Sequence, residues 1–388
     1  MNVDKNTTNA ESFSSKSELD ENDNSKYNSL GLGVEYEDVG ITNPFDPAAI
    51  KVETKQMSLD TLIKRMKEGE IELSPDFQRN EVWKVPAKSR LIESLLIRIP
   101  LPAFYMDATN EESWLVVDGL QRLSTLRDFI IKETLVLTDL EFLEQFNEKK
   151  FSDLPRSYQR RIEETQVTVY LIEKGTPNDV KFNIFKRINT GGLPLSSQEI
   201  RHALNQGPVT TFLKELAESE IFIKATDKGI RDNRMSDREC VIRFFAFVIT
   251  PYSQYNGDFD AFLGNAMARM NRMSSLDLKE MKRRFDRAMS IAIKIFGRNA
   301  FRKQFRDKNN RHPINKALFE SWSVNLEQLT DHEVAILEIK KKDLIDYFME
   351  MMENQEFNNT VTQGTGNFMR VRTRFEIIQR IIQIVLSD

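Results

Sequence analysis

Cysteine and histidine are scarce in this 388-residue sequence, and their scarcity excludes several classes of protein. The one cysteine, Cys240, cannot form an internal disulfide framework. The three histidines, His202, His312 and His332, lie far apart and show no metal-ligand spacing. We therefore expect no zinc finger and no metal site built from these residue types.

Long hydrophobic runs are missing as well. No window approaches the roughly 20 uninterrupted apolar residues of a membrane span, and the N-terminal stretch has no apolar segment typical of a secretory signal. The phosphate-binding loop GxxxxGK[ST] does not occur in the sequence. These absences predict a protein without a membrane segment, for which the cytoplasm is the default location.

The charge is distributed unevenly. The net charge is −4, but residues 1–50 hold 3 basic and 10 acidic residues, which leaves 52 basic and 49 acidic residues in the remainder. We expect residues 1–43 to be a disordered acidic tail, because their Ser, Asn, Asp and Glu content cannot bury enough apolar surface to order the chain. The mildly basic remainder keeps nucleic acid among the candidate partners.

Periodicity divides the rest of the chain into two parts. Residues 44–205 mix strand and helix patterns, which predicts an α+β domain, whereas residues 206–388 predict an all-helical domain. The first part has expected strands at 71–73, 103–107, 114–117 and 167–172 and expected helices at 59–68, 87–98, 121–132, 177–188 and from Ser196 onward. The stretch 139–165 is charged and also predicted to be helical, with a break at Pro155.

Capping signals add detail to the helices. Ser58 is the expected N-cap of the first helix, and Ser196 with Glu199 forms a capping box. In the second part, Ser236 and Glu239 predict another capping box before a strongly apolar helix. Further helical periods cover residues 260–270, 276–296, 315–321, 331–350 and 368–386.

The segment WLVVDGLQRLSTLR, from Trp114, predicts a buried strand, a glycine turn and a helix. Gly119 allows a tight turn and a close approach of a ligand, and the free N–H groups of a helix start favour an anion. An exposed Arg122 offers planar donors suited to phosphate, Ser124 and Thr125 add hydroxyls, and Asp118 would hold a metal or orient water. The alternative is a plain strand–turn–helix with surface charges.

Two other segments carry polar side chains beside turn residues. SPDFQR, from Ser74, precedes Trp83 and is either a polar site or a solvated loop with one aromatic anchor. In FKRINTGGLPLSSQEIR, from Phe185, two helix ends flank a Gly-Gly turn. Four polar side chains would cluster near that turn: Arg187, Asn189, Glu199 and Arg201. The signals that begin and end the two helices do not by themselves require these residues.

Four segments in this order resemble the GmrS-type family, the N-terminal, NTPase-like domain of type IV, modification-dependent restriction systems. The segments are SPDFQRNEVW, RLIESLLIRIPLP, VVDGLQRLST and FKRINTGGLPLSSQEIR. They span about residues 55–205, and the helical remainder, through GTGNFMRVRTRFE, resembles the tail of single-polypeptide members.

The resemblance implies a ParB/sulfiredoxin-like α+β core, in which an acidic-Gly-x-Gln/His-Arg motif at a helix start holds nucleotide phosphates. On this chain Asp118, Gln121 and Arg122 would be the catalytic residues, and the nucleotide-binding residues would be Gln78, Arg79, Gly119, Ser124, Thr125, Arg187 and Asn189. The implied cofactor is a nucleoside triphosphate, with Mg²⁺ as a candidate companion ion. The family motif often has glutamine where this chain has Leu120, a departure that bears on hydrolysis rather than on phosphate binding.

Restriction systems of this kind couple the domain to an HNH-type nuclease on the same chain or on a partner. The three isolated histidines do not supply the closely spaced His and Asn or Asp of such a site, and no Glu-x-Lys follows Pro75-Asp76 at the spacing of a PD-(D/E)xK nuclease. We therefore expect a separate nuclease subunit and no HNH or zinc nuclease site on this chain.

A basic region is the last candidate feature. Residues 282–316 hold 12 Lys and Arg against Asp286 and Asp307. Lys294, Arg298, Arg302 and Arg306 recur every four residues, so they would share one helical face if the helix continues through Gly297. Such a stripe is either a nucleic-acid-binding face that contacts phosphates or a solvated face.

Three hypotheses remain open. The favoured one is a nucleotide-binding, NTP-hydrolysing protein of a DNA-restriction or anti-phage defence system that engages DNA, including modified DNA. The second is a non-catalytic ParB-like module that binds nucleic acid, and the third is an adaptor for a separate nuclease. The oligomeric state and the identity of the nucleotide are not determined by the sequence.

Overall fold

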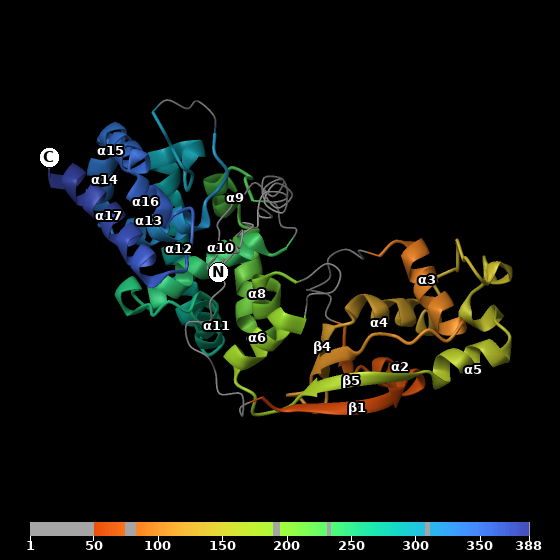
Figure 1. The fold of residues 1–388 in the computed structure, drawn as a ribbon. Coiled ribbons are helices and arrows are strands. Elements are labelled where there is room, and N and C mark those ends of the chain that lie inside the picture. The colour runs from red at the N-terminus through yellow and green to blue at the C-terminus, as the bar shows by residue number, and fades with distance from the viewer. Residues whose placement is uncertain (1–49, 74–82, 189–194, 231–233, 307–310, 388) are drawn as a thin grey trace, which may run out of the picture.

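The computed structural model describes residues 50–73, 83–188, 195–230, 234–306 and 311–387, which form two lobes (Figure 1). One lobe contains a five-stranded sheet with helices, and the other is all helical. This confirms the prediction of an α+β part followed by a helical part. The predicted acidic tail, residues 1–43, lies outside the described residues.

The sheet is mixed, with strand order β1-β5-β3-β4-β2. β5 pairs antiparallel with β1 and parallel with β3, and β4 pairs antiparallel with β3 and parallel with β2. The strands are β1 (Val52–Ser58), β2 (Ile71–Glu72), β3 (Phe104–Asp107), β4 (Trp114–Asp118) and β5 (Gln166–Ile172). β1 was not expected from the sequence, because this edge strand is mostly exposed and lacks an apolar alternation.

One face of the sheet forms a hydrophobic core with four helices. In β5, Val167, Val169 and Leu171 alternate toward this core. The helices are α2 (Leu59–Lys67), α3 (Val85–Leu96), α4 (Leu120–Leu126) and α5 (Arg156–Glu164). Ser58 caps α2, as predicted, because its Oγ accepts a hydrogen bond from the Thr61 N–H at 3.3 Å.

The helical prediction for residues 139–165 was wrong before Pro155. This stretch contains only short 3-10 turns at Glu144–Phe146 and Phe151–Asp153, and α5 begins after Pro155. The buried carboxylate of Glu93 on α3 explains the difference. It accepts hydrogen bonds from the N–H groups of Glu141, Phe142 and Leu143 at 3.1, 2.7 and 2.9 Å, which these residues would otherwise direct into a helix.

The helical lobe has one continuous core rich in buried phenylalanine. Its helices are α8 (Pro208–Ala217), α9 (Glu220–Thr226), α10 (Ser236–Ile249), α11 (Phe259–Met270), α12 (Ser275–Phe296), α13 (Lys316–Glu327), α14 (Asp331–Ile339), α15 (Lys341–Glu353), α16 (Gln355–Thr360) and α17 (Phe368–Ser387). The period expected over 331–350 is split at Lys340 into α14 and α15. In the part of the chain that the structure describes, no helix combines the length and apolar character needed to cross a membrane.

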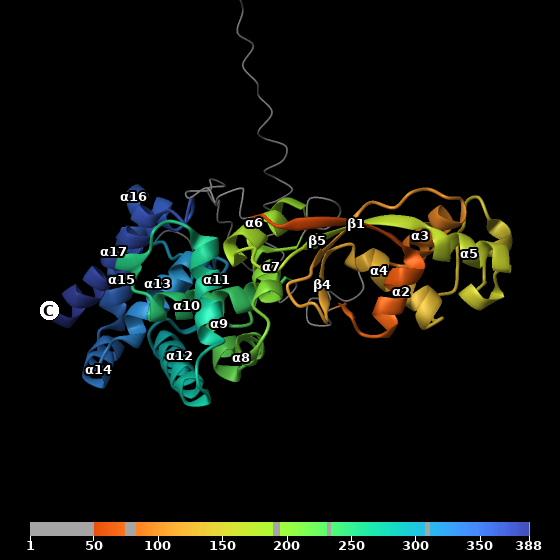
Figure 2. The same ribbon diagram turned by 90° about the horizontal axis from the view of Figure 1, so that it is seen from below.

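The two lobes meet at α6 (Asn178–Ile188) and α7 (Ser197–Leu204), which lie between the sheet and the helical lobe (Figure 2). Their apolar side chains pack against Val117 and Ile172 at the ends of β4 and β5. On the opposite side, Asp260 of α11 accepts hydrogen bonds from Arg201 at 2.5 Å and from Lys186 at 3.1 Å. This pair of helices therefore fixes the sheet ends against the helical lobe.

Candidate functional site

The turn between β4 and α4 is the center of the candidate site. β4 ends at Asp118, Gly119 is the N-cap with φ +100°, and α4 begins at Leu120. A Cβ atom on Gly119 would lie 2.4 Å from a ring carbon of Phe104, so only glycine fits this position without a shift. The predicted strand, glycine turn and helix are confirmed, although the expected 121–132 helix continues from α4 as a π-helical turn at Arg127–Ile131.

Arg122 is buried rather than exposed, so this part of the prediction was wrong. Its guanidinium donates to the carbonyl oxygens of Pro102 and Ala103 and to Asp118 Oδ2, at 2.8 Å for the carboxylate, and lies over the Phe104 ring. Burial lowers the pKa of Arg122, and the Asp118 carboxylate partly opposes that shift. Arg122 therefore fixes the start of β3 to the β4–α4 turn and orients Asp118.

Asp118 remains accessible on the other side. Its side chain is 28% exposed, and among the described residues its Oδ1 atom has no hydrogen-bond partner. Across the sheet it pairs with Tyr105, which stacks on Tyr170 with ring centroids 4.8 Å apart. Burial, followed by Tyr170 and Asp118, raises the pKa of Tyr105, so its hydroxyl stays protonated beside the carboxylate.

The two hydroxyl residues of the motif are buried. Ser124 and Thr125 are buried, and Thr125 Oγ1 donates to the Gln121 carbonyl at 2.8 Å. They lie one helical turn beyond the glycine, on the face of α4 that packs into the core. Their role as phosphate donors stays a prediction, and Gln121, in the first turn, is partly exposed.

The remaining predicted nucleotide ligands lie in other segments of the chain. Gln78, Arg79 and Asn189 lie outside the described residues. Arg187 is exposed in the last turn of α6. The structure thus brings together Asp118, Gly119, Gln121 and Arg122 and leaves the role of the other four as a prediction.

Sequence reasoning missed two buried ion pairs in the α+β lobe. Lys181 of α6 donates to both Asp107 oxygens, at 2.9 and 3.2 Å, and to Thr109 Oγ1. Lys88 of α3 donates to Asp128 at 2.8 Å. No local signal marks these pairs, because the partners are 74 and 40 residues apart in the sequence.

The predicted basic stripe is also wrong as a helical face. α12 ends at Phe296, and Gly297 has φ +55°, so the helix does not continue. Arg302 is buried and donates to the carbonyls of His312 and Thr226 at 2.7 and 2.9 Å. The four cations therefore cannot act as one phosphate-facing row.

Acidic residues from elsewhere in the helical lobe pair with most cations of this region. Lys294 and Glu338 are 2.6 Å apart, and Arg306 and Glu350 are 3.8 Å apart. The other cross-chain pairs are Arg284–Glu327, Arg287–Asp331, Arg298–Asp227 and Lys316–Glu239. The sequence count overlooks these acids because they lie outside residues 282–316.

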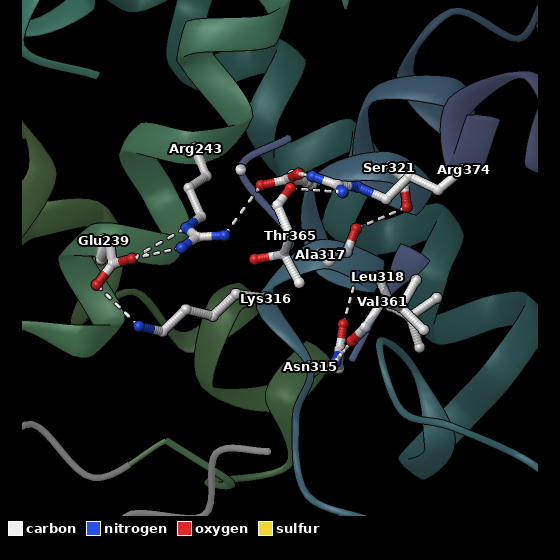
Figure 3. A network of polar contacts seen from close by, with 12 residues as sticks. Glu239, Arg243, Asn315, Lys316, Ala317, Leu318, Ser321, Val361, Thr365 and Arg374 are labelled. Atoms are coloured by element: carbon white, nitrogen blue, oxygen red, sulfur yellow. Dashed lines mark hydrogen bonds and ion pairs between the residues drawn. The ribbon is translucent and has the colours of Figure 1, made fainter. Parts of the chain in front are cut away.

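The predicted capping box at Ser236 and Glu239 is wrong too. The N-cap of α10 is Met235, with φ +56° and no side-chain cap. Glu239 instead faces a buried polar network (Figure 3), in which it accepts hydrogen bonds from Arg243 at 2.8 and 3.0 Å and from Lys316 at 2.8 Å. Burial raises the pKa of Glu239, but the cations Lys316, Arg243 and Arg201 outweigh this and hold it well below its usual range.

The center of the network is closed to solvent. Arg243 also donates to Glu320, which in turn accepts from Arg374, and these three side chains have at most 1% exposed surface. Among the described residues, no group of three or more His, Cys, Asp or Glu side chains is arranged to hold a metal ion. The β4–α4 turn therefore remains the strongest candidate site.

Comparison with known proteins agrees with the location of this turn. Residues 59–205 match the family model for the GmrSD restriction endonuclease, N-terminal domain. The match includes β4, Gly119 and α4 as well as α6 and α7. Searches of curated proteins and of solved structures found no match.

Proposed function

We propose that this protein, whose residues 59–205 form a domain of the GmrSD N-terminal family, is a nucleotide-dependent component of a DNA-restriction or anti-phage defence system. The domain would have a ParB/sulfiredoxin-like fold and bind a nucleoside triphosphate at the β4–α4 turn. The observation that carries this proposal is the glycine turn at Asp118–Arg122 within the matched segment. The protein would engage DNA in the cytoplasm and act with a separate nuclease subunit.

The geometry of the turn supports a phosphate ligand. Gly119 has no side chain to cap α4, so the N–H groups of the first turn are left for another acceptor. Asp118 would bind Mg²⁺ through its accessible carboxylate oxygen, because this ion prefers carboxylate and phosphate oxygens. When bound, this ion would neutralise phosphate charge, while Arg122 keeps Asp118 in place.

Binding without hydrolysis is the second candidate function, and one observation favours it. The Arg122 guanidinium already donates to two carbonyls and to Asp118. It is therefore not available as a free cation for the charge that develops during phosphoryl transfer. In that case Gln121 and Leu120 would contact the nucleotide, and the domain would switch DNA or nuclease binding without consuming it.

Titration of the full chain with ATP, GTP, CTP and UTP, with and without duplex DNA, tests the proposal. We expect at least one nucleotide to bind in a Mg²⁺-dependent manner, and Asp118→Asn to remove that dependence. Asp60→Asn, a similar change at an exposed ion pair on α2, is the control. Release of phosphate by the wild-type chain separates the two functions, and Gln121→Ala should abolish that release if hydrolysis occurs.

Failure of all four nucleotides to bind, in a folded protein, would contradict nucleotide binding. Binding that is identical in wild type and Asp118→Asn at every Mg²⁺ concentration would instead place the nucleotide elsewhere on the molecule. Incubation of the purified chain with modified and unmodified DNA, Mg²⁺ and nucleotide tests the nuclease prediction. Cleavage lost in His312→Ala or His332→Ala would contradict the expectation of a separate nuclease.

A further inference from the structure

One cluster in the helical lobe gathers three arginine side chains around the end of a single helix. Asp227, at the C-terminal end of α9, is shared by Arg298 and Arg311, and Arg302 lies against the same turn. Three guanidinium groups thus surround one carboxylate. Burial, followed by Arg311 and Arg298, lowers the pKa of Arg302 to about 10, although the Asp227 carboxylate opposes the shift.

The contacts show how the two outer arginines are arranged. Arg311 NH1 and Arg298 Nε lie 2.6 and 3.1 Å from the same oxygen of Asp227, Oδ2. Arg311 Nε and NH2 donate to the Arg298 carbonyl at 3.1 and 2.6 Å, which orients the guanidinium. The Arg298 side chain is 79% exposed, and its terminal nitrogens have no partner among the described residues. Two oriented guanidinium groups on one oxyanion are the arrangement by which proteins hold phosphate.

Arg302 lies buried beside this pair and holds the backbone on which it rests. It is 5% exposed, and its terminal nitrogens donate to the carbonyls of His312 and Thr226. Its Nε atom is buried and has no hydrogen-bond partner. Because its terminal donors are occupied by these two carbonyls, the donors left for a ligand are those of Arg298 and Arg311, which face the Asp227 carboxylate.

The backbone at Asp227 is costly for a residue that serves only to end a helix. Asp227 and Lys228 have φ values of +48° and +54°, a region that favours glycine. Glycine follows only at Gly229, where a Cβ atom would lie 2.2 Å from Arg302 NH2. Aspartate is among the few non-glycine residues that tolerate this conformation, and here it places a carboxylate between the two arginines.

We propose that Arg298 and Arg311 form a binding site for a phosphate group of the DNA backbone, and that the Asp227 carboxylate occupies this site when DNA is absent. The anion site stands on the contacts above, and only the source of the phosphate rests on the proposed engagement of DNA. Asp227 competes with the phosphate, so DNA must displace a built-in counter-ion before it gains both arginines. Such a contact would position the protein on the DNA backbone and would not recognise the base sequence.

Fluorescence anisotropy of a labelled duplex with the full chain tests the site. We expect Asp227→Asn to tighten binding and Arg311→Gln to weaken it, each by about tenfold, as for one charge-assisted contact. Arg311→Gln should also reduce the slope of log K against log salt by about 0.9. Glu280→Gln and Arg283→Gln are the matched controls, because this exposed pair on α12 undergoes the same charge changes.

Thermal unfolding with sodium pyrophosphate is the second arm, and it does not require DNA. We expect pyrophosphate to raise the Tm of Asp227→Asn by more than it raises the Tm of wild type or of Glu280→Gln. Arg311→Lys, which keeps the charge and loses the fork, replaces Arg311→Gln if the latter does not fold.

The outcomes separate the two proposals. If Asp227→Asn and Arg311→Gln match their controls in both arms, the anion site is overturned. If the variants change the response to pyrophosphate but not DNA binding, the DNA source of the phosphate is overturned. If wild type binds no DNA, the proposed engagement of DNA fails, and the pyrophosphate arm alone decides whether the anion site exists.

Discussion

Glu320 and Arg374 form an ion pair in the center of the helical lobe, and neither side chain has any exposed surface. Arg374 also donates to the carbonyls of Thr360 and Thr365 at 3.2 and 2.7 Å, and the second Glu320 oxygen accepts from Arg243 at 3.2 Å. The pair therefore joins α13 and α17 through a network in which each charge faces an opposite one (Figure 3).

Removing one member of this pair should be strongly destabilising. We expect Arg374→Met to lower the free energy of unfolding by about 3–5 kcal/mol, because the fully buried Glu320 carboxylate loses a charged partner. Arg372→Met, two residues earlier on α17, removes an exposed pair with Glu376 and should be close to neutral. Urea denaturation of both variants measures the difference, and equal losses would contradict the prediction.

Gly119 and Gly264 should respond in opposite directions to the same substitution. Gly119→Ala places a methyl group against the Phe104 ring and forces alanine to adopt a φ of +100°. We expect this change to destabilise the protein by more than about 1 kcal/mol. Gly264, inside α11, has open space around it, so Gly264→Ala should stabilise by about 0.5–1 kcal/mol. Thermal unfolding tests both, and a neutral Gly119→Ala would show that the turn adapts.

Arg122 should tolerate even lysine poorly. Arg122→Lys keeps the charge but loses the planar guanidinium that donates to two carbonyls and to Asp118 at once. We therefore expect the free energy of unfolding to fall by about 1–3 kcal/mol. Arg90→Lys, at an exposed pair with Glu141, is the control and should be close to neutral. The stability of each variant is measured by urea denaturation, and an unchanged Arg122→Lys protein would argue that the buried contacts contribute little.

Glu93 should make the α+β lobe sensitive to acid. Burial raises the pKa of Glu93, but three backbone N–H donors outweigh it, and the net pKa is lowered. A carboxyl with a lowered folded pKa stabilises above its unfolded value, about 4.3, and loses that contribution as the pH falls through the folded value. We therefore expect the free energy of unfolding to fall less in Glu93→Gln than in wild type when the pH is lowered from about 5 to 3. A parallel pH dependence in the two proteins would contradict this assignment.

Local signals predicted much of the fold and the position of the site. Ser58 and Ser196 cap their helices as expected, because a capping hydroxyl and the N–H group that donates to it lie within three residues. The strand before Gly119 and the helix after it were also predicted from a short segment. In each case the residues that determine the structure are neighbours in the sequence.

The failures share a different cause. Arg122 was expected to be exposed, but its partners Pro102 and Ala103 lie 20 and 19 residues earlier. Arg302 matches a four-residue period, yet the chain turns at Gly297 and Arg302 contacts Thr226, 76 residues away. Periodicity records spacing along a helix and contains no information about which distant carbonyl or carboxylate a cation will meet.

The packing of α7 has a consequence for dividing the chain into pieces. Arg201 is 2% exposed and reaches Asp260, Gln198 contacts Met267, and the Asn205 carbonyl accepts from Asn271. A recombinant fragment that stops at residue 205 would present these side chains and the apolar face of α7 to water. Such a fragment should self-associate during purification unless residues of the helical lobe are supplied as a second polypeptide.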